Sequence, residues 1–319
     1  MHGSIKLFSG TGCPALADEI SQHLNVPLSG RHLAQFPNEN IFVQLDESIR
    51  GQDVFLIQTT SSPVNYNIME LLIFLDALKR ASPDRITVVI PYLSYGRSDR
   101  KDQPRVPITA RLLADIISIA GADRYILLDL HADQIQGFFS INGDVLTIFP
   151  ILADYLRDKQ LNTEKTTVVS ADLGFAKKAR NLAAELDLPL ALVEKRRVAM
   201  DTEALTLVGD VDGRDAIVVD EEVDTGGTMV NAVNIIREHG ARNIHLCFAH
   251  AVLSSPAVER LRDLSVQGIV TTNSIPIPAE KQLPNLTILS VAHLLSRVIK
   301  RVHEGSSVGE VFRGYRRYQ

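Results

Sequence analysis

Short apolar runs alternate with amphipathic helical patterns along the whole chain of 319 residues. The apolar runs predict strands at 5–8, 41–45, 54–57, 86–90, 125–130, 167–169, 190–193, 216–219, 245–249 and 268–271. Helical spacing predicts helices among them at 68–79, 110–119, 175–186 and 229–239. In the last of these, one apolar face follows the i, i+3, i+4, i+7 pattern through Met229, Ala232, Val233 and Ile236. This alternation predicts an α/β fold in which mainly parallel sheets carry helices on both faces.

The length of the chain predicts more than one domain, since a typical domain has ~100 to 200 residues. The clearest change of unit lies around 142–150, where the turn signal Asn142-Gly143-Asp144 precedes the next strand and helix. We therefore predict two domains, 1–147 and 148–319, with the last helix or tail packing back on the first. The two halves show a similar alternation of predicted strands and helices, which favours a duplicated α/β unit.

The composition is that of an ordinary globular protein, with 45% hydrophobic and 22% charged residues. A net charge of −5 argues against a general nucleic-acid or anionic-membrane binder, because both need a broad basic surface. The first residues show no secretory signal, and the sequence contains no apolar stretch long enough to span a membrane. Cys13 and Cys247 have no spacing typical of a zinc site or a disulfide framework, which favours a reducing cytoplasm.

Residues 218–228, VVDEEVDTGGT, combine a predicted strand end with four carboxylates and a loop of small residues. The loop from Asp224 to Thr228 precedes a predicted helix, so its backbone N–H groups can hold a phosphate. Carboxylates at the strand end, such as Asp220 and Glu221, can accept hydrogen bonds from adjacent sugar hydroxyls. A helix cap with acidic residues is the alternative, but it accounts for only one or two of the four carboxylates.

This stretch resembles the binding motif for phosphoribosyl pyrophosphate (PRPP) shared by two families. Type I phosphoribosyltransferases consume PRPP, and ribose-phosphate pyrophosphokinases make it. Four further segments resemble motifs of the second family in the right order: ESIRGQD at 47–53, PVNYNIMELLIFLDALKR at 63–80, PYLSYGRSDRKDQPRVPIT at 91–109 and YILLDLHADQIQGFF at 125–139. The resemblance covers almost the entire chain and implies two tandem type I phosphoribosyltransferase-like domains.

The resemblance also implies roles for individual residues. Those that match the ribose 5-phosphate site are Asp220, Glu221, Asp224, Thr225, Gly226, Gly227 and Thr228. Those that match the ATP site are Phe36, Asn38, Glu39, Asn40, Arg97, Ser98 and Asp99, of which the first four reach the adenine of a neighbouring subunit in the family. His131 and Asp172 match the residues associated with Mg²⁺, and Lys195 and Arg197 match catalytic residues that close over the reaction centre. A dimer-based hexamer is the implied assembly.

Several positions depart from the family pattern. The replacements are Asn40 for Glu, Ser98 for Gln, Ala171 for Pro, Phe175 for Gly and Glu221 for Asp. They leave open the nucleotide preference and the effect of Phe175 and Glu221 on activity. Ser48 and Arg50 fit the family's regulatory pocket, but Asp133 and Gly309 differ from many members, so strong phosphate activation or ADP inhibition is not predicted.

We interpret the sequence as that of a Mg²⁺-dependent enzyme that converts ATP and ribose 5-phosphate into PRPP and AMP. One alternative is a phosphoribosyltransferase that consumes PRPP, but it leaves the Arg97 loop and the DLH segment unexplained. The other is a catalytically silent subunit that associates with an active synthetase; the presence of Lys195 and Asp220 argues against it. The sequence does not decide between a hexamer and a dimer, or the number of metal ions.

Overall fold

The structure is a computed structural model that describes residues 3–197 and 203–313, except for the side chains of 195–197 and 203–205. The chain divides into two compact units. The first unit contains residues 1–147, 274–276 and 290–311, and the second is built chiefly from 148–273 and 277–289. Each unit has its own sheet and its own hydrophobic core.

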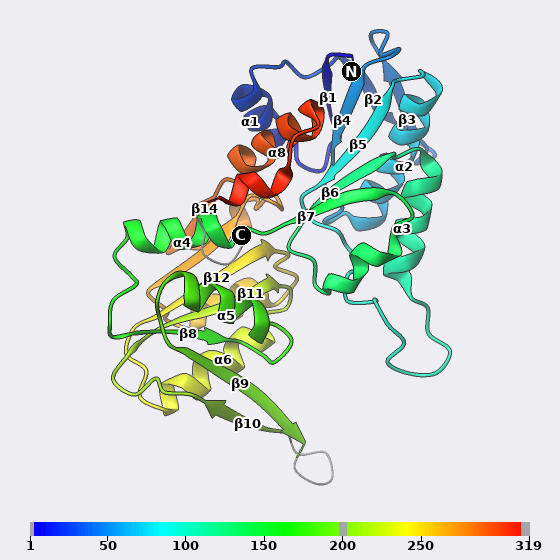
Figure 1. Cartoon of the computed structure of the whole chain (residues 1–319). Helices are drawn as coiled ribbons and strands as arrows, with labels where there is room; N and C mark the ends of the chain where they lie inside the picture. Colours follow the sequence, from blue (N-terminus) through cyan, green and yellow to red (C-terminus); the bar gives the residue numbers. More distant parts are fainter. Residues whose placement is uncertain (1–2, 198–202, 314–319) are drawn as a thin grey trace. The chain divides into compact units, whose positions relative to one another are not determined.

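The first unit is built on a five-stranded parallel sheet, as Figure 1 shows. Its strands, in spatial order, are β1 (Ile5–Ser9), β4 (Asp53–Ile57), β5 (Arg85–Ile90), β6 (Arg124–Leu128) and β7 (Asn142–Leu146). Helices α2 (Val64–Arg80) and α3 (Thr109–Ala120) share a core with one face of this sheet. On the other side, α1 (Pro14–Leu24) packs against α8 (Ala292–Glu304). An antiparallel hairpin of β2 (Arg31–Gln35) and β3 (Ile41–Leu45) lies beside α2.

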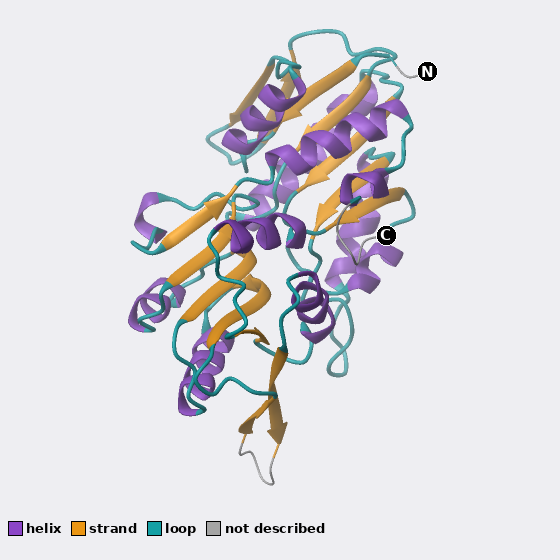
Figure 2. Ribbon diagram, turned by 60° about the vertical axis from the view of Figure 1, so that its left-hand side comes forward, coloured by secondary structure: helices purple, strands orange, loops and turns teal. Residues whose placement is uncertain are grey.

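The second unit has a seven-stranded sheet that is parallel except at one edge. Its strands, in spatial order, are β10 (Glu203–Val208), β9 (Leu190–Arg197), β8 (Thr166–Ser170), β11 (Asp215–Val223), β12 (Ile244–Ala251), β13 (Gly268–Thr272) and β14 (Leu286–Leu289). Only β10 runs antiparallel to its neighbour within this sheet. The helices are α4 (Phe149–Asp158), α5 (Ala176–Glu185), α6 (Gly227–Glu238) and α7 (Ala257–Asp263). Figure 2 shows helices on both faces of the strands.

The two units share one topology. The order β1-β4-β5-β6-β7 corresponds to β8-β11-β12-β13-β14, and the hairpins β2–β3 and β9–β10 are inserted at the same point of each. The units also exchange a helix: α4 follows β7 but belongs to the second unit, and α8 follows β14 but belongs to the first. The predicted α/β fold of two similar halves is therefore confirmed.

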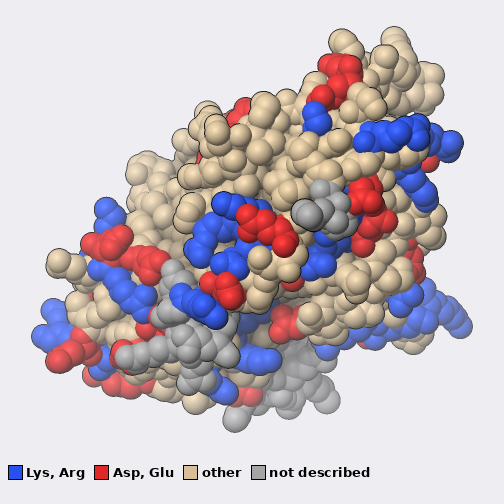
Figure 3. Space-filling model, turned by 45° about the horizontal axis from the view of Figure 1, so that its top comes forward, with Lys and Arg blue, Asp and Glu red and all other residues tan. Residues whose placement is uncertain are grey.

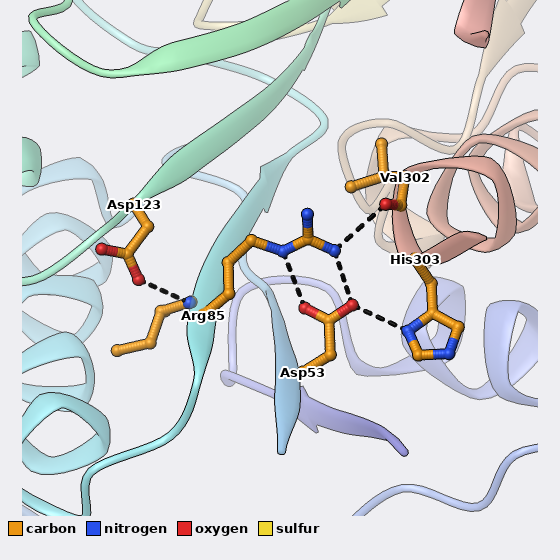
Figure 4. Close-up of polar contacts among 6 residues, drawn as sticks. Asp53, Arg85, Asp123, Val302 and His303 are labelled. Atoms are coloured by element: carbon orange, nitrogen blue, oxygen red, sulfur yellow. Dashed lines mark hydrogen bonds and ion pairs between the residues drawn. The ribbon is translucent and has the colours of Figure 1, made fainter. Parts of the chain in front are cut away.

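A polar cluster fixes α8 to the first unit (Figure 4). Asp53, the first residue of β4, is fully buried and accepts two hydrogen bonds from Arg85, at 2.9 Å from Nε and 2.6 Å from Nη2. Arg85 Nη2 also donates to the carbonyl oxygen of Val302 at 3.1 Å. His303 Nδ1 lies 2.8 Å from Asp53 Oδ2. We name these residues the α8 clasp: Asp53, Arg85, Val302 and His303.

Two features of the sequence prediction are wrong in detail. The segment Asn142-Gly143-Asp144 is not a turn but the start of edge strand β7. Glycine is required there because a Cβ on Gly143 would lie 2.4 Å from the ring of Tyr125, and Asp144 pairs with Arg124 at 2.5 Å. The run 41–45 is a strand, but it belongs to an antiparallel hairpin and not to a parallel sheet. The sequence prediction gave no bounds for the following elements: α1, β2, β7, α4, β10, α7, β14 and α8.

Acidic and basic side chains lie interspersed on the face that Figure 3 shows, in keeping with the small net charge. Within the described residues, no helix has both the length and the apolar character needed to span a membrane. Both cysteines are buried and free, and burial raises the pKa of the Cys13 thiol to about 12, so this thiol stays protonated at neutral pH.

Candidate functional site

The acidic stretch lies at the carboxyl end of β11, a central strand of the second sheet. The strand is longer than predicted and continues through Asp220, Glu221 and Glu222 to Val223, because its pairing with β12 extends to Val223, whereas its pairing with β8 ends at Val219. Asp220 is 7% exposed and Glu221 is 8% exposed. Ligands of parallel α/β sheets bind at this end of the strands, so these two carboxylates lie where a ligand is expected.

The carboxylate of Asp220 is held in an electrostatically unfavourable position. Burial is the largest cause that raises its pKa well above the usual value, followed by the negative charge of Glu221 and, more weakly, that of Asp172. The Glu221 N–H donates to Asp220 Oδ1 at 2.9 Å and partly offsets this effect. Hydroxyl donors or a cation arriving from a ligand would stabilise the charged form of Asp220.

The loop that connects this strand to α6 is shorter than predicted: it spans residues 224–226, and Gly227 and Thr228 are the first residues of the helix. Gly226 precedes the helix with φ 79°, a left-handed conformation that suits glycine. The first helical hydrogen bond runs from Val230 N–H to Gly226 O at 3.0 Å. The N–H groups of 227–229 therefore lack an acceptor within the helix, and no side chain of the described residues caps this end. A phosphate can accept hydrogen bonds from them.

Asp172 lies in the loop between β8 and α5, next to β11 in the sheet. Its Oδ1 accepts a hydrogen bond from the Phe175 N–H at 3.0 Å, and Ser170 Oγ donates to its carbonyl oxygen at 2.7 Å. The ring of Phe175 is 1% exposed and packs on Phe149, with ring centroids 5.7 Å apart. Phe175 thus points into the core, and its backbone has ordinary right-handed helical angles that need no glycine.

In the first unit, Arg97 and His131 occupy exposed positions in loops that follow β5 and β6. The two loops approach closely, since a Cβ on Gly96 would lie 3.3 Å from the Cβ of His131. Asp99 is largely buried and accepts a hydrogen bond from Gln134 Nε2, which ties the loops together. Ser98 Oγ accepts a bond from the Thr109 N–H at 3.4 Å, so this hydroxyl holds the loop to the start of α3.

Phe36, Asn38, Glu39 and Asn40 form the turn of the β2–β3 hairpin. The turn is closed by a hydrogen bond from the Phe36 N–H to Asn40 O at 2.8 Å. Phe36 is 49% exposed, and its ring centroid lies 5.9 Å from that of Phe42, which is 41% exposed. The hairpin therefore presents two aromatic rings to its surroundings.

Lys195 and Arg197 were predicted just after a strand that ends at Val193. The structure extends this strand, β9, to Arg197 and pairs it with β10, with Lys195 opposite Leu205 and Arg197 opposite Glu203. The side chains of both residues lie outside the described part of the structure.

The sequence prediction missed a buried polar cluster in the first unit, beneath the loop from β1 to α1. Glu70 is fully buried; its carboxylate accepts hydrogen bonds from Thr11 N–H and Oγ1, both at 2.6 Å, and from Gln58 Nε2 at 3.0 Å. A Cβ on Gly10 would lie 2.3 Å from Gln58 Oε1. The paired glycines of Gly10-Thr11-Gly12, next to a predicted strand, were the available signal. In the second unit the loop at the corresponding point contains Asp172.

The described residues contain no group of three or more His, Cys, Asp or Glu side chains placed to hold a metal ion. His131 belongs to the first unit and Asp172 to the second. Mg²⁺ keeps several waters and commonly needs only one or two protein carboxylates together with substrate phosphates, so a carboxylate such as that of Asp172 is a suitable type of ligand for a metal bound with its nucleotide.

Comparison with known proteins identifies the family to which this chain is similar. Residues 5–121 match the family model for the N-terminal domain of ribose phosphate pyrophosphokinase, and 193–313 match that for a phosphoribosyl synthetase-associated domain. A ribose-phosphate pyrophosphokinase of Caldanaerobacter subterraneus subsp. tengcongensis is 47% identical over 97% of this chain and 98% of its own length. One from Aquifex aeolicus is 44% identical over 98% of this chain and all of its own.

A solved structure shows the same relationship. The crystal structure of phosphoribosylpyrophosphate synthetase from Mycobacterium smegmatis is 41% identical and superimposes with a TM-score of 0.90. The match covers 95% of this chain and 100% of that one. With identity at this level over nearly the full length of several relatives, the chain belongs to the ribose-phosphate pyrophosphokinase family.

Proposed function

We propose that this protein transfers the pyrophosphoryl group of ATP to the anomeric hydroxyl of ribose 5-phosphate and releases PRPP and AMP. The observation that carries the proposal is the buried pair Asp220 and Glu221 near the end of β11, the strand that leads through a short loop into an uncapped helix N-terminus. This arrangement offers acceptors for two sugar hydroxyls beside donors for a phosphate. The likeness to ribose-phosphate pyrophosphokinases over nearly the whole chain favours synthesis of PRPP over its consumption.

Ribose 5-phosphate binds at the end of β11 in this proposal. The residues from Asp224 to Thr228 hold the 5-phosphate through backbone N–H groups and the hydroxyls of Thr225 and Thr228. Asp220 and Glu221 accept hydrogen bonds from the two ribose hydroxyls. These hydrogen bonds hold the sugar and also stabilise the charged form of the buried Asp220 carboxylate.

The anomeric hydroxyl attacks the β-phosphorus of ATP in line with the leaving AMP. The new O–P bond forms as the hydroxyl loses its proton, and the bond between the β-phosphorus and the oxygen retained by AMP breaks. Such transfers depend mainly on positioning and on neutralising the charge of the phosphoryl oxygens. Lys195 and Arg197 have this neutralising role in the proposal.

ATP is bound in the proposal by Arg97, Ser98 and Asp99, with Ser98 acting by holding the loop to α3. The hairpin turn 36–40 reaches the adenine of a neighbouring subunit, and the exposed ring of Phe36 supports this role. The assembly is accordingly a homo-oligomer, a dimer-based hexamer. His131 and Asp172 would hold Mg²⁺ with the nucleotide, where the cation would offset the negative charge of the phosphates.

A two-substrate assay tests the proposal. Purified protein with Mg²⁺, ATP and ribose 5-phosphate should form AMP and PRPP in equal amounts, whereas a Lys195→Ala variant should form far less. A parallel assay with PRPP and a nucleobase tests the phosphoribosyltransferase alternative and should show no loss of PRPP. Product formation no greater than that of Lys195→Ala would overturn the proposal.

A further inference from the structure

Helix α7 lies directly against the loop at 224–228. A Cβ on Gly226 would lie 3.5 Å from the Cα of Ala257, the first residue of α7. One turn further on, Arg260 Nη1 donates a hydrogen bond to the carbonyl oxygen of Thr225 at 2.9 Å. The same nitrogen lies 3.8 Å from the position of a Cβ on Gly227, the first residue of α6. The guanidinium therefore contacts the loop on both sides of Gly226.

Among the residues that the structure describes, no neighbour neutralises the charge of Arg260. Among the described residues, no carboxylate lies within ion-pair distance of its guanidinium, and the bond to Thr225 O is its one side-chain hydrogen bond. A guanidinium has five N–H groups, so four are left for other acceptors. An exposed arginine is usually solvated and mobile, but this one is attached to the backbone of a loop built for an anion.

The contact with Thr225 has an electrostatic consequence for an anion in the loop. A carbonyl oxygen carries a partial negative charge and repels a phosphate that approaches the same loop. A cationic donor on that oxygen offsets the repulsion and adds a positive charge beside the N–H groups of 227–229. It also restricts the peptide between Thr225 and Gly226 to one orientation.

We infer that Arg260 is a positioning residue of the ribose 5-phosphate site, because its guanidinium fixes the Thr225 carbonyl and places a positive charge beside the loop at 224–228. The inference rests on the proposed function and deepens it, since it explains how the chain selects a phosphorylated sugar. The ligand class is a sugar phosphate. The preference for a phosphorylated sugar comes in part from the charge of Arg260, which lies on α7 and outside the loop at 224–228.

Three variants separate this role from a structural one. Arg260→Gln keeps a planar N–H donor but removes the charge, and Arg260→Lys keeps the charge but loses the fixed fork of the guanidinium. Arg262→Gln is the matched control, because Arg262 lies two residues away on the same short helix and is exposed. For each variant, the affinity for ribose 5-phosphate is measured by calorimetry, and KM for both substrates, kcat and Tm are determined.

Arg260→Gln should weaken ribose 5-phosphate binding and raise its KM by about tenfold or more, the effect of losing one charge-assisted contact. KM for ATP and Tm should change little, Arg260→Lys should be intermediate, and Arg262→Gln should match wild type. Unchanged ribose 5-phosphate affinity in Arg260→Gln would overturn the inference, as would equal losses for both substrates together with a lower Tm.

The same data distinguish the two proposals. If wild type binds ribose 5-phosphate but forms no PRPP, the proposed reaction fails while the binding data still decide the role of Arg260. If wild type does not bind ribose 5-phosphate at all, both proposals are overturned.

Discussion

At the scale of single residues, the carboxylate of Asp220 links ligand binding to stability. Burial and the neighbouring charges raise its pKa in the folded protein above the value it has in the unfolded chain. The folded state therefore favours the protonated form. As pH rises from below 3.8 through the raised pKa, the folded protein has to ionise a buried group, and the free energy of unfolding falls.

Asp220→Asn should therefore raise the Tm at pH 7 to 8, because it removes a buried negative charge beside Glu221. An increase in Tm of a few degrees is expected, the size of effect that relief of about 1 kcal/mol has on a domain of this length. The same variant should lose most of its affinity for ribose 5-phosphate. Thermal melts between pH 4 and pH 8, with exposed Asp263→Asn as control, measure the effect; a lower Tm at neutral pH would contradict it.

Phe175 is a residue whose role could be judged only from its packing. The sequence left open the effect on activity of Phe175 in place of a family glycine, whereas the structure shows its ring buried against Phe149. Phe175→Ala should destabilise the second unit by about 3–4 kcal/mol while leaving KM for both substrates near wild type. Leu173→Ala, 51% exposed in the same loop, is the control and should change Tm little. A large change in KM without a change in Tm would show that Phe175 acts in the site.

At this scale the sequence predicted that Asp220 and Glu221 lie at the end of a strand, but not which residues surround them. Asp220 and Glu221 follow an apolar run, so their place at the end of a strand could be read locally. The contact of Arg260 with Thr225, 35 positions earlier, could not be predicted, because it depends on how α7 packs on the loop. The same holds for Glu70, whose partner Thr11 lies 59 positions away.

At the scale of helices and strands, the α8 clasp holds α8, which is distant in sequence, against the sheet of the first unit. Asp53 is fully buried, and three of its contacts come from Arg85 and His303. A buried acid that loses its charge leaves its partners uncompensated, so one substitution at this position should loosen the whole helix.

Asp53→Asn should destabilise the first unit by about 2–4 kcal/mol and increase hydrogen exchange in α8. The control is Asp76→Asn, which removes an exposed ion pair with Arg80 and should cost less than about 1 kcal/mol. Hydrogen exchange measured by mass spectrometry locates the change. Equal exchange in α8 of both variants would contradict a role for the clasp.

The sequence predicted central strands better than edge strands. The residues of central strand β4 are buried throughout, and the continuous apolar run at 54–57 is the signal of a strand covered on both faces. Edge strands such as β7, which begins Asn142-Gly143-Asp144, carry polar and turn-forming residues and lack that signal. A helix after the segment 142–150 and a last helix of the chain were predicted without bounds, and they correspond to α4 and α8.

At the scale of the whole molecule, the exchange of α4 and α8 makes each unit depend on a segment that follows the other unit's sheet. The buried face of α8 includes Leu295, Val298, Ile299 and Val302, and each such side chain contributes about 1.5–3 kcal/mol when buried. A cut at the boundary between 147 and 148 would therefore leave the first sheet without one of its covering helices.

A fragment of residues 1–147 should aggregate or unfold at a lower temperature than the first unit within the full chain. Joining residues 290–311 to it through a flexible linker should restore folding, because this segment supplies α8 and the His303 end of the clasp. Circular dichroism and thermal melts compare the two fragments. Identical melts would contradict the dependence on α8.

The proposed reaction moves two phosphoryl groups of ATP together to ribose 5-phosphate at the end of β11. Phosphorus NMR of a reaction with Mg²⁺, ATP and ribose 5-phosphate follows each phosphorus atom directly. We predict that the β and γ signals of ATP are replaced by the two pyrophosphoryl signals of PRPP, with one AMP formed for each. Formation of ADP with a single phosphate transferred, or release of inorganic phosphate without PRPP, would contradict the claim.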